Sequence, residues 1–226
     1  MKTVAVIPAY NEEKRIAASV KDAAKFVDAV VVVDDCSKDQ TQEIAWQAGA
    51  YVLPHVINRG QGAALQTGTD FALQKLDADI VIHFDADGQM CGEDIPNMIK
   101  PIEEGKADIV LGSRFLGKKS NMPFSRRITI KFALLFTIII SGIRVTDTHN
   151  GFRALSREAA SKIKIKMNRM AHASEILDLI QAKKLRYTEC PVKIRYTEDT
   201  LDKGQSFASG FAILKDYFKG KFFDEV

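Results

Sequence analysis

Two carboxylates one residue apart follow an apolar run in the segment HFDADGQ, residues 83–89. In an extended chain, side chains at positions i and i+2 point the same way, so Asp85 and Asp87 can face one point. Paired hard oxygen ligands suit Mg²⁺ or Mn²⁺, and an ion bound this way keeps positions for substrate phosphates. Gly88 allows the backbone to turn, and Gln89 offers an amide oxygen. The alternative is a solvated turn that caps the next helix, because such strings are common at strand ends.

A second carboxylate pair, Asp34 and Asp35, follows the apolar run of VVVVDDCSKDQT, residues 30–41. Ser37 or Asp39 is explained as a cap of the helix that follows, but a cap needs only one acceptor. The adjacent pair therefore needs another explanation. A carboxylate can accept hydrogen bonds from a base N–H or from ribose hydroxyls, so the pair favours a nucleotide site.

Two further polar strings leave two interpretations open. PAYNEEKRI, residues 8–16, places Asn11 where a helix would start, with Glu12 and Glu13 in its first turn. Glu12 could instead hold a ribose or a base. NRGQGAALQTG, residues 58–68, does not match the G-x-G-x-x-G fingerprint, and its glycines indicate helix packing or a close backbone approach to a ligand.

The elements that position these strings alternate between apolar β-branched runs and helical patterns. We expect strands at 3–7, 29–33, 51–54, 79–84, 108–112 and 185–194, and helices at about 12–27, 40–48, 61–76, 93–104 and 173–183. Such alternation predicts an α/β fold with a mainly parallel sheet covered on both faces. Ligands bind such sheets at the carboxyl ends of the strands, so four of these ends could line one crevice. The polar strings at these four ends are PAYNEE, DDCSKD, DADGQ and, after the fifth strand, GSR.

Composition and charge narrow the function classes. The chain has 226 residues, 46% of them hydrophobic and 27% charged, which suits one large globular domain. The three cysteines are far apart, so neither a disulfide framework nor a structural zinc site is indicated, and we expect a reducing, cytosolic compartment. The N-terminal residues do not resemble a signal peptide. A net charge of +3 argues against nucleic acid as the main partner.

No acidic residue lies between Asp108 and Asp147, and the basic residues of this segment favour the binding of an anion. It includes an apolar run at 132–143 that is shorter than the about 20 residues needed to span a bilayer, so we expect a buried or interfacial helix. The tail, residues 201–226, mixes phenylalanine and lysine as an amphipathic helix would. The bases of the segment are Arg114, Lys118, Lys119, Arg126, Arg127, Lys131 and Arg144.

Taken in order, these strings resemble the family-2 glycosyltransferases with a GT-A fold. The branch with the greatest similarity includes the dolichyl-phosphate mannose and glucose synthases and related polyprenyl-phosphate glycosyltransferases. The resemblance spans about residues 3–195 and implies a GT-A domain at 1–200 followed by the tail at 201–226. The strings that carry it are IPAYNEE, VVVDDCSKDQT, NRGQGAALQTG, DADGQ, GSRF, SRR and VTDTHNGFRALS.

The resemblance implies a donor site with a divalent metal. Asp85, Asp87 and Gln89 would bind Mg²⁺ or Mn²⁺, which holds the diphosphate of a sugar nucleotide. Cys36 stands where the family often has glycine, a departure that leaves the Asp34–Asp35 pair intact. The residues implied to hold the nucleotide sugar are Pro8, Ala9, Tyr10, Glu12, Asp34, Asp35, Gln61, Asp85 and Ala86.

The acceptor side is implied by the same resemblance. Arg114, with Arg126 and Arg127, would hold a lipid phosphate, a group that the planar guanidinium suits. Asp147 resembles the catalytic or acceptor-site aspartate of the family, and Arg114 would join it in catalysis. A phosphate oxygen needs no general base, whereas a hydroxyl acceptor would need one, with Asp147 first and Glu175 second.

Three of the four histidines can be interpreted from the sequence, and none is assigned a catalytic role. His149 and His172 are interpreted as a polar loop residue and a helix-start residue. His83 lies within a predicted strand, where a satisfied core histidine is expected.

We therefore expect an inverting, metal-dependent glycosyltransferase that moves a sugar from a UDP-sugar, or GDP-mannose, to a polyprenyl or dolichyl phosphate. Inversion follows from the resemblance. We further expect peripheral contact with the cytoplasmic face of a membrane, and a homodimer is possible. The alternatives are transfer to a saccharide hydroxyl, a sugar nucleotidyltransferase, a haloacid-dehalogenase-type phosphatase and a non-enzymatic nucleotide-sugar sensor.

Overall fold

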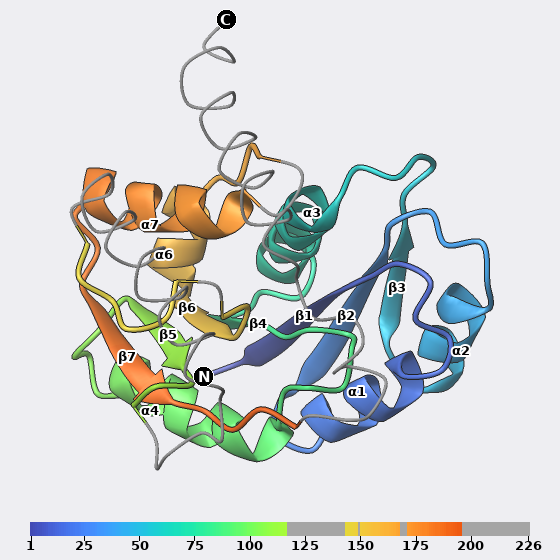
Figure 1. Ribbon diagram of the computed structural model, residues 1–226, viewed down its shortest axis with the longest axis horizontal. Coiled ribbons are helices and arrows are strands. Elements are labelled where there is room, and N and C mark those ends of the chain that lie inside the picture. The colour runs from blue at the N-terminus through green and yellow to red at the C-terminus, as the bar shows by residue number, and fades with distance from the viewer. Residues whose placement is uncertain (117–142, 149, 168–170, 196–226) are drawn as a thin grey trace, which may run out of the picture.

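The computed structural model describes residues 1–116, 143–148, 150–167 and 171–195 (Figure 1). The strands are β1 (Thr3–Ala9), β2 (Ala29–Asp34), β3 (Tyr51–Pro54), β4 (Ile80–His83), β5 (Ile109–Ser113), β6 (Arg153–Ser156) and β7 (Tyr187–Pro191). The helices are α1 (Ile16–Ala23), α2 (Thr41–Gln47), α3 (Gln61–Gln74), η1 (Gly92–Asp94), α4 (Ile95–Glu103), α6 (Arg157–Lys162) and α7 (His172–Ala182).

One sheet contains all of these strands in the order β3-β2-β1-β4-β6-β5-β7. β6 runs antiparallel to β4 and β5, and the other pairings are parallel, which confirms the predicted α/β fold with a mainly parallel sheet. β6 was not predicted, because it is short and begins with an arginine. β1 lies between β2 and β4, so the strand order reverses there, and ligands bind open α/β sheets at such a reversal.

Alternate residues of the strands pack on opposite faces of the sheet. In β1, Ala5 and Ile7 join the core beneath α1 and α4, whereas Val4 and Val6 join the core beneath α3 and α7. In Figure 1, α3, α6 and α7 lie on one side of the sheet and α1, α2 and α4 on the other. Because both faces are covered, the strands are apolar on both sides, as is typical of parallel sheets.

The predicted start of the first helix at about residue 12 was wrong, since α1 begins at Ile16. Asn11 has a φ of 54°, a left-handed conformation that cannot continue a right-handed helix. Its Oδ1 accepts a hydrogen bond from the Lys38 backbone at 2.9 Å, and a Glu13 carboxylate oxygen accepts one from the Gln40 backbone at 3.1 Å. These side chains therefore join the loop after β1 to the loop after β2 instead of capping a helix.

Several predictions concern residues outside the described ranges. They are Arg126 and Arg127, the apolar run at 132–143, His149 and the tail at 201–226. Among the residues that the structure describes, no helix is both long and apolar enough to span a bilayer.

Candidate active site

A cavity of about 340 Å³ opens at the carboxyl ends of β1 and β4, where the strand order reverses. Loops after β1, β2 and β4 contribute to it, as the sequence predicted, together with the starts of α3, β6 and α7. The segment after β5 does not line it. The lining residues are Pro8, Ala9, Tyr10, Glu12, Asp35, Gln61, Ala64, Asp85, Ala86, Asp87, Gly151, Arg153, His172 and Ala173.

Asp85 and Asp87 both face this cavity. Burial, together with the negative charge of Asp87, raises the pKa of Asp85 to about 7. Gln61 Nε2 donates to Asp85 Oδ1 at 3.1 Å. On the other side, a Cβ added at Gly151 would lie 2.6 Å from Asp85 Oδ2, so only glycine leaves room for the carboxylate. The positive charges of Arg153 and Arg114 lower the pKa of Asp85, but by less than burial and Asp87 raise it.

The donor atoms of this pair fit a divalent metal ion, because two close carboxylates with a raised pKa gain most from a cation. Within the described ranges, no group of three or more histidine, cysteine or acidic side chains is arranged to hold a metal ion. The Gln89 backbone N–H donates to Asp87 Oδ1 at 2.9 Å, which fixes the turn after the pair. Gln89 itself does not line the cavity.

The carboxylates of the second pair point to different surroundings. Asp35 lines the cavity and accepts hydrogen bonds from the backbone of Arg59 at 2.9 Å and of Gly60 at 2.6 Å. It also contacts His55 Nδ1 at 2.8 Å, a residue that the sequence analysis did not single out. Asp34 is buried away from the cavity lining, and its Oδ2 accepts from the Ser37 backbone at 3.2 Å. Asp35 therefore shapes the loop that leads into α3.

Glu12 and Tyr10, both predicted to hold a nucleotide, line the cavity. The Glu12 carboxylate forms an ion pair with Arg15 at 3.2 Å, and its backbone N–H donates to Thr41 Oγ1 at 2.8 Å. The Tyr10 side chain is exposed and offers an aromatic ring at the edge of the cavity. The structure thus places most of the predicted nucleotide residues around one opening.

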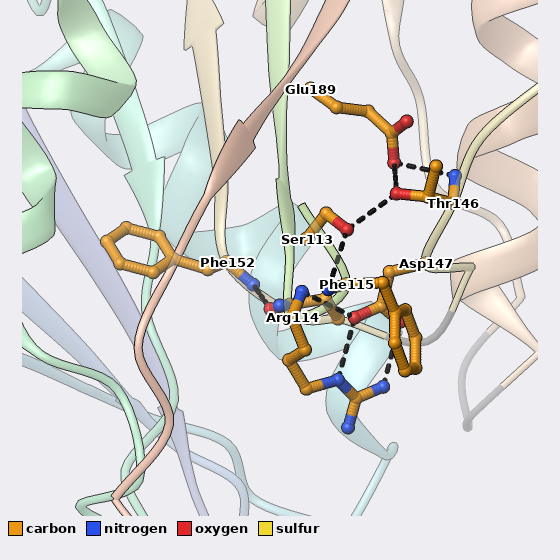
Figure 2. Close-up of polar contacts among 8 residues, drawn as sticks. Ser113, Arg114, Phe115, Thr146, Asp147, Phe152 and Glu189 are labelled. Carbon is orange, nitrogen blue, oxygen red and sulfur yellow. Dashed lines mark hydrogen bonds and ion pairs between the residues drawn. The ribbon is translucent and has the colours of Figure 1, made fainter. Parts of the chain in front are cut away.

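Arg114 and Asp147 lie together beyond β5, and they bind each other (Figure 2). Arg114 donates from Nε to Asp147 Oδ2 at 2.7 Å and from Nη2 to Oδ1 at 2.8 Å, and its backbone N–H reaches Oδ2 at 3.1 Å. Asp147 is 4% exposed. The two residues predicted to be catalytic therefore form one bidentate ion pair, which lies outside the lining of the cavity.

A chain of hydrogen bonds behind this ion pair fixes its backbone (Figure 2). Glu189 accepts at 2.8 Å from both the backbone N–H and the hydroxyl of Thr146. The Thr146 hydroxyl lies 2.6 Å from the Ser113 hydroxyl, which also accepts from the Phe115 backbone at 3.2 Å. These hydrogen bonds connect Ser113, Phe115 and Thr146, the neighbours of Arg114 and Asp147 in the chain, to Glu189 of β7.

Glu175, the second choice for a base, has a different role in the structure. Its two carboxylate oxygens accept hydrogen bonds from the backbone N–H groups of Lys166 and Met167, both at 2.9 Å. It lies on α7, buried, and outside the cavity lining. Glu175 therefore anchors the segment that follows α6 to α7.

The histidines differ from their predicted surroundings in part. His83 is a core residue whose Nε2 lies 3.1 Å from Thr69 Oγ1, but its buried Nδ1 has no hydrogen-bond partner in the described part of the chain. Burial lowers the pKa of His83 well below its usual value, which keeps the ring neutral. His172 does start α7, as expected, and it also lines the cavity, which the sequence did not indicate.

Comparisons with known proteins agree with this geometry. The family model described as glycosyl transferase family 2 matches residues 4–164. The chain is 33% identical, over 92% of each chain, to UDP-N-acetylglucosamine–dolichyl-phosphate N-acetylglucosaminyltransferase of Methanococcus voltae. It is 29% identical to polyprenol monophosphomannose synthase of Mycolicibacterium smegmatis, over 96% of this chain and 85% of that one.

The same fold occurs in glucosyl-3-phosphoglycerate synthase from Mycobacterium tuberculosis, solved in complex with Mn²⁺, UDP and glucosyl-3-phosphoglycerate. The TM-score is 0.69 and the identity 19%, over 96% of this chain and 77% of that one. The predicted GT-A fold is therefore confirmed.

Proposed function

The chain belongs to glycosyltransferase family 2, and we propose that it transfers a sugar from a nucleoside diphosphate sugar to a polyprenyl phosphate. The observation that carries the proposal is the Asp85–Asp87 pair, which lines a cavity at the strand-order reversal and in which the pKa of Asp85 is raised to about 7. A sugar nucleotide carries a negatively charged diphosphate. A divalent ion bound by the carboxylates would compensate the negative charge of both the carboxylates and the diphosphate.

On this proposal, Asp85 and Asp87 hold Mg²⁺ or Mn²⁺, with Gln89 as a further predicted ligand. When bound, the ion supplies Lewis-acid stabilisation of the negative charge on the diphosphate leaving group. Gln61 holds Asp85 in place through its hydrogen bond, and Gly151 leaves the space that the carboxylate occupies.

The nucleoside would lie between the loops after β1 and β2. Tyr10 offers an exposed ring for the base, and Glu12 and Asp35 stand on the same side of the cavity. Pro8 and Ala9 at the end of β1, and Ala86 after β4, form its floor in the proposal. We place UDP-sugars first because the Methanococcus voltae relative is named for a UDP-sugar and the fold relative was solved with UDP.

The acceptor is a lipid phosphate held by arginines, among which Arg114 belongs to the described residues. Asp147 fixes the plane of the Arg114 guanidinium through two hydrogen bonds, so it acts as a positioning residue for a phosphate-binding cation. A phosphate oxygen is ionised at neutral pH. It attacks the anomeric carbon directly, forming one C–O bond as the bond to the departing nucleoside diphosphate breaks on the opposite face, and the sugar is inverted.

Membrane contact is proposed from the sequence. The basic segment between Asp108 and Asp147 carries the apolar run at 132–143, and the tail at 201–226 alternates aromatic and basic side chains. Such segments lie at the headgroup level of anionic bilayers, which is where a polyprenyl phosphate presents its phosphate.

The test is a donor panel. The full chain is incubated with Mn²⁺, a short polyprenyl phosphate and one of UDP-N-acetylglucosamine, UDP-glucose or GDP-mannose, and lipid products are analysed by mass spectrometry. The proposal predicts a polyprenyl phosphate that gains one sugar from one of these donors. If every donor binds but none yields a lipid-linked sugar, while a saccharide acceptor is glycosylated, the acceptor assignment is wrong.

A further inference from the structure

Arg153 is a buried cation in the cavity that the sequence did not single out. It is the first residue of β6, lies opposite His83 of β4 in the sheet register, and is 3% exposed. Its position follows from the antiparallel insertion of β6 between β4 and β5, which brings the side chain to the cavity wall beside Gly151 and Asp85.

The guanidinium of Arg153 is incompletely satisfied. Its buried Nη1 has no hydrogen-bond partner among the described residues, and Arg153 forms no ion pair within those residues. A buried charged donor without a partner is costly, so such groups are uncommon outside functional sites. The cavity beside Arg153 is where a partner could enter.

The charges around Arg153 indicate what kind of partner it is. Burial lowers the pKa of Arg153 to about 10, while the negative charges of Asp85 and Asp147 raise it, so the side chain is cationic at neutral pH. A neutral hydroxyl could accept a hydrogen bond from Nη1 but would give this buried charge no directly bound anion. An anionic oxygen accepts the hydrogen bond from Nη1 and also balances the positive charge of the guanidinium.

The position of Arg153 within the cavity indicates which anion. Tyr10 and Asp35 line the side proposed for the nucleoside, whereas Arg153 interacts electrostatically with Asp85 on the donor side and with Asp147 on the acceptor side. Arg114 is already bound to Asp147 and lies outside the cavity lining. Arg153 therefore stands where the sugar-bearing phosphate of a donor would lie.

We propose that Arg153 donates a hydrogen bond from Nη1 to an oxygen of the distal, sugar-bearing phosphate of the nucleotide sugar. This inference rests on the proposed function. Arg153 would then contact the leaving group and compensate the charge that it gains as the bond to the sugar breaks.

The test compares how Arg153→Met, Arg153→Lys and wild type bind uridine, UMP and UDP, with the guanine series in parallel, by calorimetry in Mg²⁺. Because only the diphosphate has a distal phosphate, we expect Arg153→Met to weaken UDP binding about tenfold to a hundredfold and to leave uridine and UMP unchanged. Arg153→Lys, which keeps the charge, should lose less. Arg157→Lys is the matched control, because Arg157 pairs with the exposed Asp77.

Two results would overturn the inference. One is a folded Arg153→Met that binds UDP like wild type, and the other is an equal loss for uridine, UMP and UDP. A change confined to the KM for polyprenyl phosphate would also contradict it. If the wild type binds no nucleoside diphosphate of either base, the proposed function fails and the inference fails with it.

Thermal unfolding of each variant comes first, because a buried charge is replaced. Should Arg153→Met not fold, an NMR measurement on the chain with ¹⁵N-labelled arginine replaces it. UDP, but not UMP, should slow the exchange of the guanidinium protons of one arginine. The same change should occur in Arg114→Lys, which shows that the arginine is not Arg114. Absence of that change in the folded protein contradicts the inference.

Discussion

Two groups of carboxylates at the carboxyl edge of the sheet differ in how their negative charge is compensated: Asp85 and Asp87 are half-buried, and Asp147 is buried. At the end of β4, Asp85 and Asp87 stand together with one amide donor, Gln61, and the pKa of Asp85 is raised to about 7. Beyond β5, Asp147 is bound on both oxygens by Arg114. In the proposed function the first group binds a divalent cation together with the substrate, whereas the second is compensated by Arg114 within the protein.

This difference matches the two halves of the proposed reaction. In the proposal, the donor side binds a metal–diphosphate complex, so the repulsion between Asp85 and Asp87 is relieved only when substrate is bound. The acceptor side must present a cation to a phosphate, so its acid serves to orient the arginine. The following experiments test this contrast.

The largest effect is expected for Asp87→Asn. This change removes one proposed metal ligand charge, and transfer activity should fall by at least about a hundredfold. The thermal midpoint of the metal-free protein should stay unchanged or rise, because the repulsion with Asp85 is lost. Asp77→Asn, on an exposed side chain, is the matched control and should change neither. If Asp87→Asn keeps full transfer activity, Asp87 is not a metal ligand and the proposed difference between the two groups is wrong.

Asp147→Asn should lower the stability of the protein more than Asp87→Asn does and should lower its transfer activity less. The change leaves the partly buried Arg114 guanidinium without its charge partner and should cost about 2 kcal/mol in the free energy of unfolding, or about 4–8 °C in Tm. If Asp147 positions Arg114, the KM for the lipid phosphate rises and the pH profile of kcat keeps its shape. Loss of the acidic limb of that profile would instead indicate a general base, because a base must be deprotonated to act.

Stabilisation by a divalent ion gives a further test of the difference between Asp87 and Asp147. Mn²⁺ at ten times its dissociation constant should stabilise the wild type by about 1.4 kcal/mol, since it binds only the folded protein. Asp147→Asn should gain the same increment, and Asp87→Asn should gain almost none. Differential scanning calorimetry with and without a chelator measures all three, and equal increments in every variant would place the ion elsewhere.

The smallest effect is a pH dependence of the metal-free protein. Because the folded pKa of Asp85 is raised above its unfolded value near 4, the folded state binds more protons between about pH 4 and pH 7. The contribution of Asp85 to stability is therefore present below pH 4 and is lost as the pH rises towards 7. Denaturant titrations should show this fall in the wild type relative to Asp85→Asn, and parallel curves for the two proteins would contradict it.

The sequence predicted which residues line the cavity better than it predicted the pairing of Arg114 with Asp147, for physical reasons. Polar strings at strand ends must meet at one edge of a parallel sheet, so Asp35, Asp85 and Asp87 could be placed together from local patterns. The bond between Arg114 and Asp147 joins residues far apart in the chain, and no local pattern reports such a contact.

Other features depend on tertiary packing in the same way. β6 lacks a clear strand pattern because its first residue, Arg153, is a charge that the cavity accommodates. Asn11 and Glu13 resemble helix-start residues, but the loops of two adjacent strands bind them instead. His172 was placed correctly at a helix start, yet its place in the cavity depends on how α7 crosses the sheet.

The central claim is transfer to an ionised lipid phosphate without a general base. With the donor identified by the panel and Mn²⁺ present, we would measure the initial rate with a short polyprenyl phosphate and with the matching polyprenol, which has a hydroxyl in place of the phosphate. The account predicts a lipid-linked sugar from the phosphate alone, with loss of the product in EDTA. Equal or faster transfer to the polyprenol would contradict it.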